Sequence, residues 1–177
     1  TDKIKEICAE TANMTNQCVQ AVNFNCPGQI VIAGATEAVH KACDRLKEAG
    51  AKRAILLPVS APFHSTLMQP AADRLKEVLD SVEIVDAKIP VVANVNAKPE
   101  TKADEIRSQL VLQAASPVLW EDSVRRMMND GVDTFVEVGP GKVLCGFIKK
   151  VDRSYAPLNV EDMESLEKSL AYLKEVR

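Results

Sequence analysis

Short apolar runs that alternate with amphipathic helical patterns constrain the fold of this chain more than any other feature. From residue 65 onward, segments with helical periodicity, such as STLMQPAADRLKEVLDSV (65–82), alternate with brief apolar runs such as IPVVANV (89–95) and VDTFVEV (132–138). Strands joined through helices favour parallel pairing, because a parallel connection must cross from one end of the sheet to the other. The pattern therefore predicts an α/β fold with a mainly parallel sheet.

The same two periodicities predict the elements that follow residue 95. Helices are expected at ADEIRSQLVLQ (103–113), WEDSVRRMMNDG (120–131), KVLCGFIKKV (142–151) and DMESLEKSLAYLKEV (162–176), and a last strand at YAPLNV (155–160). Ser65 is the expected N-cap of the helix over 65–82, because a serine side chain at this position can accept a hydrogen bond from the first turn. Strands and helices therefore continue to alternate to the end of the chain.

The first 60 residues follow a different order. The pattern predicts a helix, two strands around a turn, a second helix and a third strand, at Asp2–Ala12, Cys18–Asn23, Gln29–Ala33, Glu37–Ala49 and KRAILLPVS (52–60). This α-β-β-α-β order is that of a ferredoxin-like βαββαβ unit without its first strand. We therefore expect a boundary near Ser60, with residues 1–60 forming most of a small ferredoxin-like α+β subdomain and residues 61–177 belonging to the α/β part.

The composition argues against several functional classes. A formal charge of −3 and an aromatic content of 4% argue against a protein that binds nucleic acid. The five cysteines include no CxxC pair, which argues against a disulfide framework or a zinc site. No apolar run approaches the roughly 18 residues of a membrane helix, and the charged N-terminus TDKIKEICAE does not resemble a signal peptide. We expect a cytoplasmic protein that contacts neither membrane nor nucleic acid and needs no metal or cofactor.

His64, within LPVSAPFHSTLM (57–68), is the first candidate for a catalytic residue. It directly precedes the expected start of a helix, where the partial positive charge of the helix N-terminus disfavours an imidazolium ion. A neutral histidine is the form that a general base requires. The alternative is a histidine that only makes local hydrogen bonds at a helix start, and the neighbouring residues leave both readings open. The other histidine, His40, is expected on the solvent face of its helix.

No nucleophile accompanies His64 in the sequence. A serine on a strand-to-helix elbow reads GxSxG, and none of the seven glycines stands in that pattern. The stretch VEVGPGKVL (136–144) does not match a phosphate-binding loop, because Val143 stands where serine or threonine is required. Its glycines indicate a tight turn, which can line a site at the carboxyl end of a strand. The residues by themselves therefore offer a base without a partner.

Five stretches of the chain, taken in order, resemble one known family. The similarity to the C-terminal part of the malonyl-CoA:acyl carrier protein transacylase family runs through VNFNCPGQIVIAG (22–34), GAKRAILLPVSAPFHSTLMQPAADRL (50–75), VVANVNA (91–97), QAASPVLWEDSV (113–124) and VEVGPGKVLCGFIKKV (136–151). The resemblance implies an α/β-hydrolase-like domain with an inserted ferredoxin-like subdomain. It also implies the transfer of malonyl from coenzyme A to a serine and then to the phosphopantetheine thiol of acyl carrier protein, in fatty acid biosynthesis.

The resemblance also implies roles for individual residues. His64 matches the catalytic base, and Gln113 matches the position whose backbone carbonyl holds the other ring nitrogen of that histidine. Four residues match substrate-binding positions: Asn23 and Asn25 near coenzyme A, and Phe63 and Val143 beside the acyl pocket. A phenylalanine directly before the histidine resembles the pattern that favours malonyl over methylmalonyl.

Three parts of the family's active site are absent from these 177 residues: the GHSxG serine, the arginine that pairs with the malonate carboxylate, and the GQG residue of the oxyanion site. We expect them on an N-terminal half that precedes Thr1, because the chain opens in a helical pattern without an initiator methionine. Two alternatives stay open. One is a catalytically inactive fragment that acts at most as a carrier-protein or coenzyme A-binding module, and the other is an acyltransferase module of a polyketide synthase.

Acyl carrier protein, the partner that the resemblance implies, is expected to be strongly acidic. Basic residues that could meet it through long-range attraction are Arg125, Arg126, Lys149 and Lys150. The alternative is that these side chains only keep two helix faces solvated.

Overall fold

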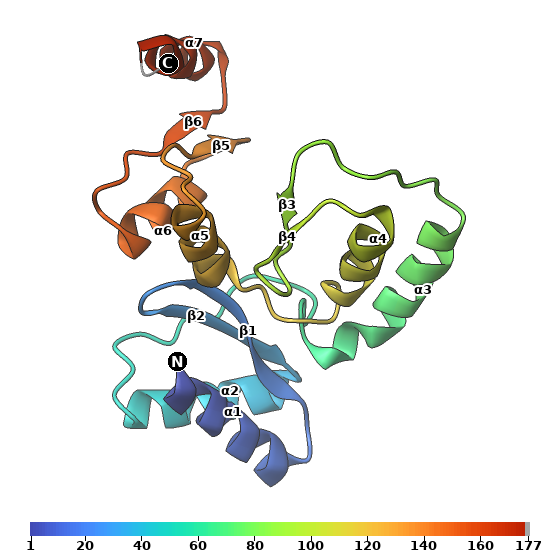
Figure 1. Ribbon diagram of the computed structural model, residues 1–177. Helices are drawn as coiled ribbons and strands as arrows, with labels where there is room; N and C mark the ends of the chain where they lie inside the picture. Colours follow the sequence, from blue (N-terminus) through green and yellow to red (C-terminus); the bar gives the residue numbers. More distant parts are fainter. Residues whose placement is uncertain (176–177) are drawn as a thin grey trace. The chain divides into compact units, whose positions relative to one another are not determined.

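The computed structural model describes residues 1–175 and shows a mixed α/β fold (Figure 1). The chain divides into two compact units, residues 1–120 and the residues from Glu121 onward. Helices and strands occur in both units, which confirms the predicted α/β class. The boundary expected near Ser60 lies inside the first unit, so the assignment of residues 1–60 and 61–177 to two subdomains stays a prediction.

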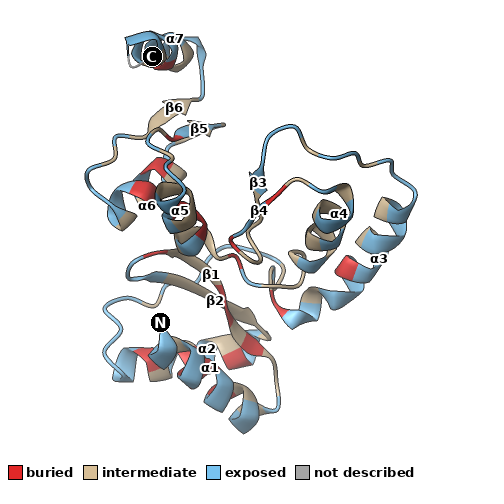
Figure 2. Ribbon diagram, in the orientation of Figure 1, coloured by how far each residue is buried: buried red, intermediate tan, exposed pale blue. Residues whose placement is uncertain are grey.

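A hairpin and two helices form the beginning of the first unit. They are α1 (Asp2–Thr15), β1 (Val19–Cys26), β2 (Gln29–Gly34) and α2 (Thr36–Glu48). The two strands pair antiparallel, and α1 and α2 both contact β1. A buried core joins these elements through Cys8, Val19, Ala38 and Ala42, and Figure 2 shows buried stretches in both helices. The four elements predicted for residues 2–49 are confirmed within a few residues at each end.

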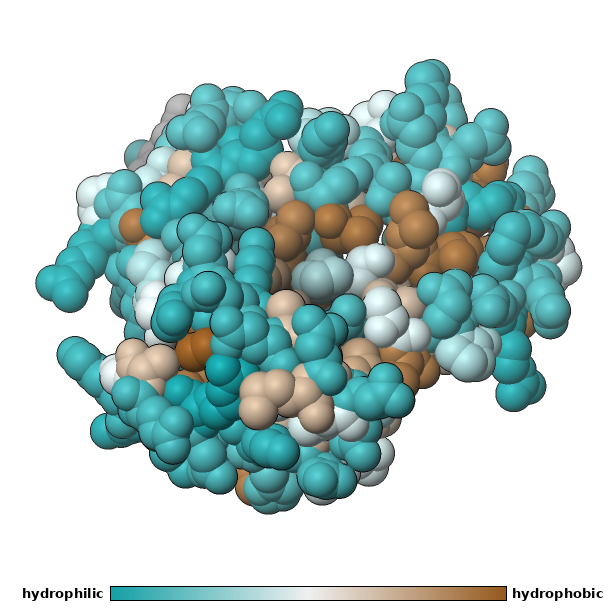
Figure 3. Space-filling view, turned by 90° about the horizontal axis from the view of Figure 1, so that it is seen from below, coloured by the Kyte–Doolittle hydropathy of each residue, from teal (hydrophilic) through white to brown (hydrophobic). Residues whose placement is uncertain are grey.

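Residues 51–60 form no strand, although KRAILLPVS has the composition of one. A strand needs a neighbour that pairs its N–H and C=O groups, and no other segment of residues 1–175 pairs with this one. Its apolar side chains are exposed, Ile55 to 69% and Val59 to 62%. Figure 3 shows apolar side chains that reach the surface of the molecule among polar ones. The predicted strand at 52–60 is therefore wrong for the described residues, because no segment among them pairs with it.

The middle of the first unit is mostly helical. Its elements are the 3-10 turn η1 (Thr66–Met68), α3 (Gln69–Asp80), β3 (Val91–Val92), β4 (Pro99–Glu100) and α4 (Ala103–Leu112). The helix expected over 65–82 becomes α-helical only at Gln69, because Pro70 lacks an N–H and is tolerated in the first turn but not further inside. The strand expected at 89–95 is reduced to the two-residue antiparallel pair of β3 with β4.

β1 also pairs with the segment that follows α4. The N–H of Phe24 donates to the carbonyl oxygen of Val118 at 2.9 Å, and the N–H of Val118 donates to the carbonyl oxygen of Val22 at 2.8 Å. These two bonds make an isolated parallel bridge between Asn23 and Val118. The hairpin is therefore joined directly to the residues between α4 and the end of the first unit.

The second unit combines helices with a small parallel sheet. Its elements are α5 (Trp120–Asn129, whose first residue ends the first unit), β5 (Val136–Val138), α6 (Val143–Val151), β6 (Leu158–Val160) and α7 (Met163–Glu175). β5 and β6 pair in parallel and are connected through α6. The helices predicted for this unit are confirmed within two residues at each end, except that Val176, the expected last helical residue, lies outside the described residues. The strands predicted at 132–138 and 155–160 are reduced to the three residues of β5 and the three residues of β6.

The mainly parallel sheet expected from the sequence is not assembled within residues 1–175. The described strands form three two-stranded pairs, of which only β5–β6 is parallel. The helices of residues 1–175 include none with the length and apolar composition needed to cross a membrane.

Candidate active site

His64 lies on a tight turn that is closed by its own neighbours. Its backbone is left-handed, with φ 62°, a conformation that a non-glycine residue keeps only where the surroundings hold it. The hydroxyl of the fully buried Ser65 donates to the carbonyl oxygen of Pro62 at 2.6 Å, and the Ser65 N–H donates to the same oxygen at 3.2 Å. The turn therefore presents the imidazole ring from a fixed backbone.

The imidazole ring of His64 meets the end of α4. Its Nδ1 lies 3.0 Å from the backbone oxygen of Gln113, the C-cap residue of that helix. A carbonyl oxygen only accepts hydrogen bonds, so Nδ1 carries the proton and the neutral ring presents the lone pair of Nε2. This arrangement suits a general base.

The two asparagines lie on β1 of the same unit. Asn23 pairs with Val31 of β2 and bridges to Val118, while Asn25 lies where the register of the hairpin shifts between Phe24 and Cys26. Both side chains are half-buried. The structure thus places both on the hairpin strand whose backbone is bonded to the segment after Gln113.

The two residues expected beside the acyl pocket fall in different units. Phe63 precedes His64 and is half exposed, as a residue available to line a site must be. Val143 is the first residue of α6 in the second unit and is also exposed. The structure brings Phe63 next to His64 but does not place Val143 relative to either.

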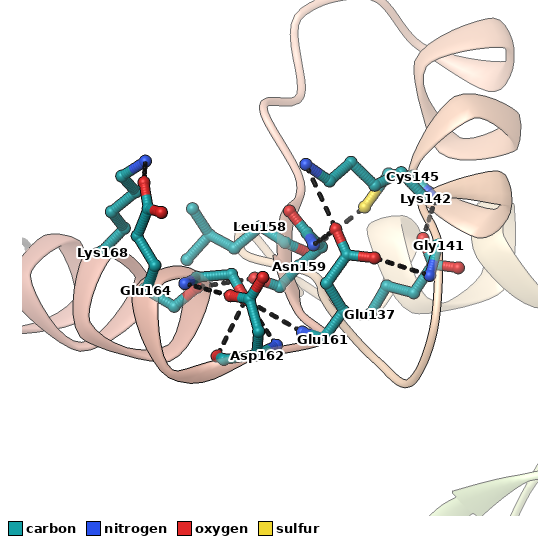
Figure 4. A network of polar contacts seen from close by, with 12 residues as sticks. Glu137, Gly141, Lys142, Cys145, Leu158, Asn159, Glu161, Asp162, Glu164 and Lys168 are labelled. Carbon is teal, nitrogen blue, oxygen red and sulfur yellow. Dashed lines mark hydrogen bonds and ion pairs between the residues drawn. The ribbon is translucent and has the colours of Figure 1, made fainter.

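Glu137 of β5 organises the start of α6, and sequence reasoning missed it. Its carboxylate accepts hydrogen bonds from the N–H groups of Leu144 at 3.1 Å and Cys145 at 2.8 Å (Figure 4). Partial burial raises the pKa of Glu137, but the N–H groups of Cys145 and Leu144 outweigh it and hold the pKa below its usual value. The signal in the sequence is a carboxylate two residues before a Gly-Pro-Gly turn that leads into a helix.

A second carboxylate secures the other side of the same turn. Glu161 accepts a hydrogen bond from the N–H of Gly141 at 2.9 Å and forms an ion pair with Lys142 at 3.4 Å (Figure 4). The glycines of GPGK thus serve a turn held by two carboxylates, which agrees with the rejection of a phosphate-binding loop.

Three cysteine thiols are held in their neutral form. Burial raises the pKa of Cys8 to about 11, and burial together with the Glu137 carboxylate raises the pKa of Cys145 to about 11. The pKa of Cys43 is also raised, chiefly by burial. A thiol attacks as its thiolate, so these three are poor nucleophiles at neutral pH.

The four basic residues considered for a protein partner differ in their surroundings. Arg125 forms an ion pair with Glu121, and Arg126 with Asp130, each one turn along α5. Lys149 and Lys150 are exposed in the last turn of α6. The charges of the two arginines are therefore partly compensated within their own helix.

Comparison with known proteins adds to this geometry. The model of the acyl transferase domain family matches residues 5–169. A malonyl CoA-acyl carrier protein transacylase of Bacillus subtilis is 48% identical over 99% of this chain and 53% of its own length. A relative of the same name from Haemophilus influenzae is 49% identical over 84% of this chain and 48% of its own length. The chain thus spans about half the length of these curated relatives.

Solved structures agree with this assignment. The acyl-carrier-protein S-malonyltransferase of Burkholderia pseudomallei superposes with a TM-score of 0.92 at 44% identity, over 97% of this chain and 55% of that one. A malonyl-transacylase solved with a type II polyketide acyl carrier protein gives a TM-score of 0.93, also at 44% identity, over 97% of this chain and 55% of that one. The chain therefore belongs to the acyl transferase domain family, among relatives that are malonyl CoA-acyl carrier protein transacylases.

Proposed function

We propose that this chain is the C-terminal part of a malonyl-CoA:acyl carrier protein transacylase of fatty acid biosynthesis. The hydrogen bond between His64 Nδ1 and the Gln113 carbonyl supports this proposal best, because it prepares Nε2 to accept a proton. The names of the relatives support the substrate and the partner. The nucleophilic serine, the arginine for malonate and the oxyanion residue then come from an N-terminal half outside these 177 residues.

The proposed reaction proceeds by two acyl transfers. His64 Nε2 takes the proton of the serine hydroxyl while the serine oxygen attacks the thioester carbonyl of malonyl-CoA. The carbon–sulfur bond breaks, and the imidazolium returns the proton to the departing coenzyme A thiol. In the second half, Nε2 takes the proton of the carrier-protein thiol, the sulfur attacks the malonyl-serine ester, and the serine oxygen recovers the proton. The Gln113 carbonyl holds Nδ1–H throughout and stabilises each imidazolium.

The substrate contacts are part of the same proposal. Asn23 and Asn25 face the coenzyme A side, and Phe63 and Val143 line the acyl pocket, where a bulky Phe63 disfavours the methyl branch of methylmalonyl. Exposed apolar residues of the 51–60 segment support an N-terminal half whose strands pair with it. Lys149 and Lys150 would meet an acidic carrier protein. Whether that carrier serves fatty acid or polyketide synthesis is an outcome of assaying both kinds.

Replacing His64 by alanine in the complete enzyme tests the proposal. Loss of a general base is expected to lower the rate of malonyl transfer from coenzyme A to carrier protein by about 10²–10⁴-fold. The control is His40→Ala, which removes an exposed histidine of α2 and is expected to leave the rate unchanged. Transfer by His64→Ala at nearly the parental rate would show that His64 is not the base.

We further propose that residues 1–177 alone are inactive. They contain no GxSxG serine, and three of their thiols have raised pKa values. A fragment of this kind would at most bind coenzyme A or carrier protein.

A further inference from the structure

The N-terminus of η1 is capped by a side chain that is distant in sequence. Ser65 occupies the N-cap position, but it makes no capping bond. Its hydroxyl donates to Pro62 instead, so the predicted capping role of Ser65 is wrong. The N–H of Thr66 is therefore left without a local acceptor at the start of the turn.

Gln20 of β1 supplies the missing acceptor. Its Oε1 accepts a hydrogen bond from the Thr66 N–H at 2.9 Å and lies 3.2 Å from the Thr66 hydroxyl, which can donate to the same oxygen. Cys18 Sγ lies 3.5 Å from that hydroxyl. Gln20 of β1 thus binds the backbone two positions beyond His64.

The same strand is also bonded to the chain that follows Gln113, the other member of the pair. Further along β1, the backbone of Val22 and Phe24 is bonded to Val118, five residues after Gln113. One strand therefore contacts the chain shortly after His64 and again shortly after Gln113, although the two residues are 49 positions apart. β1 is therefore placed to influence the separation of the ring and its carbonyl partner.

The left-handed backbone of His64 makes this support necessary. The φ of 62° is unfavourable for a histidine and persists only if both sides of the residue are held. Pro62 and Ser65 close the turn by their own hydrogen bonds, and Gln20 anchors its far end from another element.

We propose that Gln20 is a positioning residue that holds the His64 turn so that Nδ1–H stays directed at the Gln113 carbonyl. The inference rests on the proposed role of His64 as general base. Gln20 acts through Thr66 and the turn, and it takes no part in binding the acyl group. Its loss should therefore lower the turnover number and leave the KM for malonyl-CoA unchanged.

The test replaces Gln20 by methionine in the complete enzyme, which keeps the length of the side chain and removes the acceptor oxygen. We expect kcat to fall about fivefold, which corresponds to the net contribution of one hydrogen bond. In ¹⁵N spectra of the histidine rings, assigned with a His64→Gln variant, the His64 signal should move from the Nδ1–H form towards a mixture of tautomers. Gln20→Glu keeps an oxygen at the same reach and should retain the Nδ1–H form and most of kcat.

Gln69→Met is the matched control, because the exposed side chain of Gln69 donates its hydrogen bond to Asp73 within α3 and not to the His64 turn. This variant should keep both kcat and the ring signal. If Gln20→Met folds poorly, Gln20→Asn, whose amide is too short to reach Thr66, is measured in its place with the same expectation.

Two results would overturn the inference: an unchanged kcat and ring signal in the Gln20 variants, or a loss that appears only in KM or in melting temperature. The His64→Ala variant distinguishes a failure of the proposed function from a failure of the role proposed for Gln20. If that variant stays active, His64 is not the base, whereas an inactive His64→Ala beside a fully active Gln20→Met rejects the role of Gln20 alone.

Discussion

Two residues, His64 and Glu137, make contacts that the hydrophobic periodicity of the sequence does not predict. His64 has a left-handed backbone and a ring bonded to a carbonyl from a different helix. Glu137 turns its carboxylate onto the N–H groups at the start of α6. The ends of every helix leave some backbone N–H and C=O groups without a partner inside the helix. In both cases here, a side chain makes a hydrogen bond to such groups. The residue-scale consequences can be tested separately.

Glu137→Gln should destabilise the complete enzyme by about 1 kcal/mol at pH 7, because a neutral amide accepts more weakly than a carboxylate. The pKa of Glu137 is lower in the folded protein than the ordinary value of 4.5. Its carboxylate therefore stabilises the fold above that value, and the contribution is lost as the pH falls through the folded pKa. Melting temperatures of the two proteins should differ at pH 7 and converge at low pH.

Glu164→Gln is the control for this pH series. Glu164 pairs with Lys168 on the exposed surface of α7, where an ion pair contributes little. A melting temperature that falls equally in both variants, or a Glu137→Gln difference that does not shrink at acid pH, would contradict the role assigned to Glu137.

Helices and strands differ in how far the local sequence determines whether they form. Helices are confirmed throughout residues 1–175 because their hydrogen bonds are internal and their apolar residues recur on one face. Strands depend on a neighbour, and so 52–60 forms none and 89–95 is cut to two residues. The β1–β2 hairpin succeeds because its two strands are adjacent in sequence and pair with each other across a short turn.

Position 34, at the end of β2, requires glycine because the backbone of Cys18 lies very close to it. A Cβ atom at Gly34 would lie 2.1 Å from the carbonyl oxygen of Cys18, which belongs to the backbone and cannot rotate away. Gly34→Ala should therefore lower the free energy of unfolding of the complete enzyme by about 1–3 kcal/mol. Denaturant unfolding measures the effect.

Gly146→Ala is the matched substitution, because Gly146 lies within α6 and a Cβ there meets no atom within 4 Å. It should be neutral or stabilise by up to about 1 kcal/mol, since alanine favours a helix more than glycine does. Equal effects of the two substitutions would refute the contact at Gly34.

The whole molecule combines a family match with features that are incomplete within the described residues. A chain that matches about half of its relatives' length exposes apolar side chains in residues 51–60, where a sheet strand was predicted. Its proposed base has a fixed tautomer, yet the family's serine motif lies outside the 177 residues. Both observations motivate the proposal made above that an N-terminal half completes the enzyme.

Intact-mass spectrometry under denaturing conditions, after brief exposure to malonyl-CoA, tests this at the scale of the molecule. The 177-residue chain should stay unmodified, because it lacks the GxSxG serine and because burial raises the pKa of Cys8, Cys43 and Cys145 and disfavours their thiolates. The complete enzyme is the control and should gain one malonyl group, on a peptide other than this one. Malonylation of a serine or cysteine within residues 1–177 would contradict the proposal.

The sequence by itself determined the α/β class, the helices, the first hairpin and, through ordered motifs, the family. These depend on periodicity and on short-range turn chemistry, which any local stretch contains. Only the tertiary structure decided that Gln20 rather than Ser65 caps the following turn, that Glu137 caps α6 and that residues 52–60 stay unpaired. Each of these depends on a hydrogen-bond partner brought from elsewhere in the chain or missing from it, and no local pattern specifies such a partner.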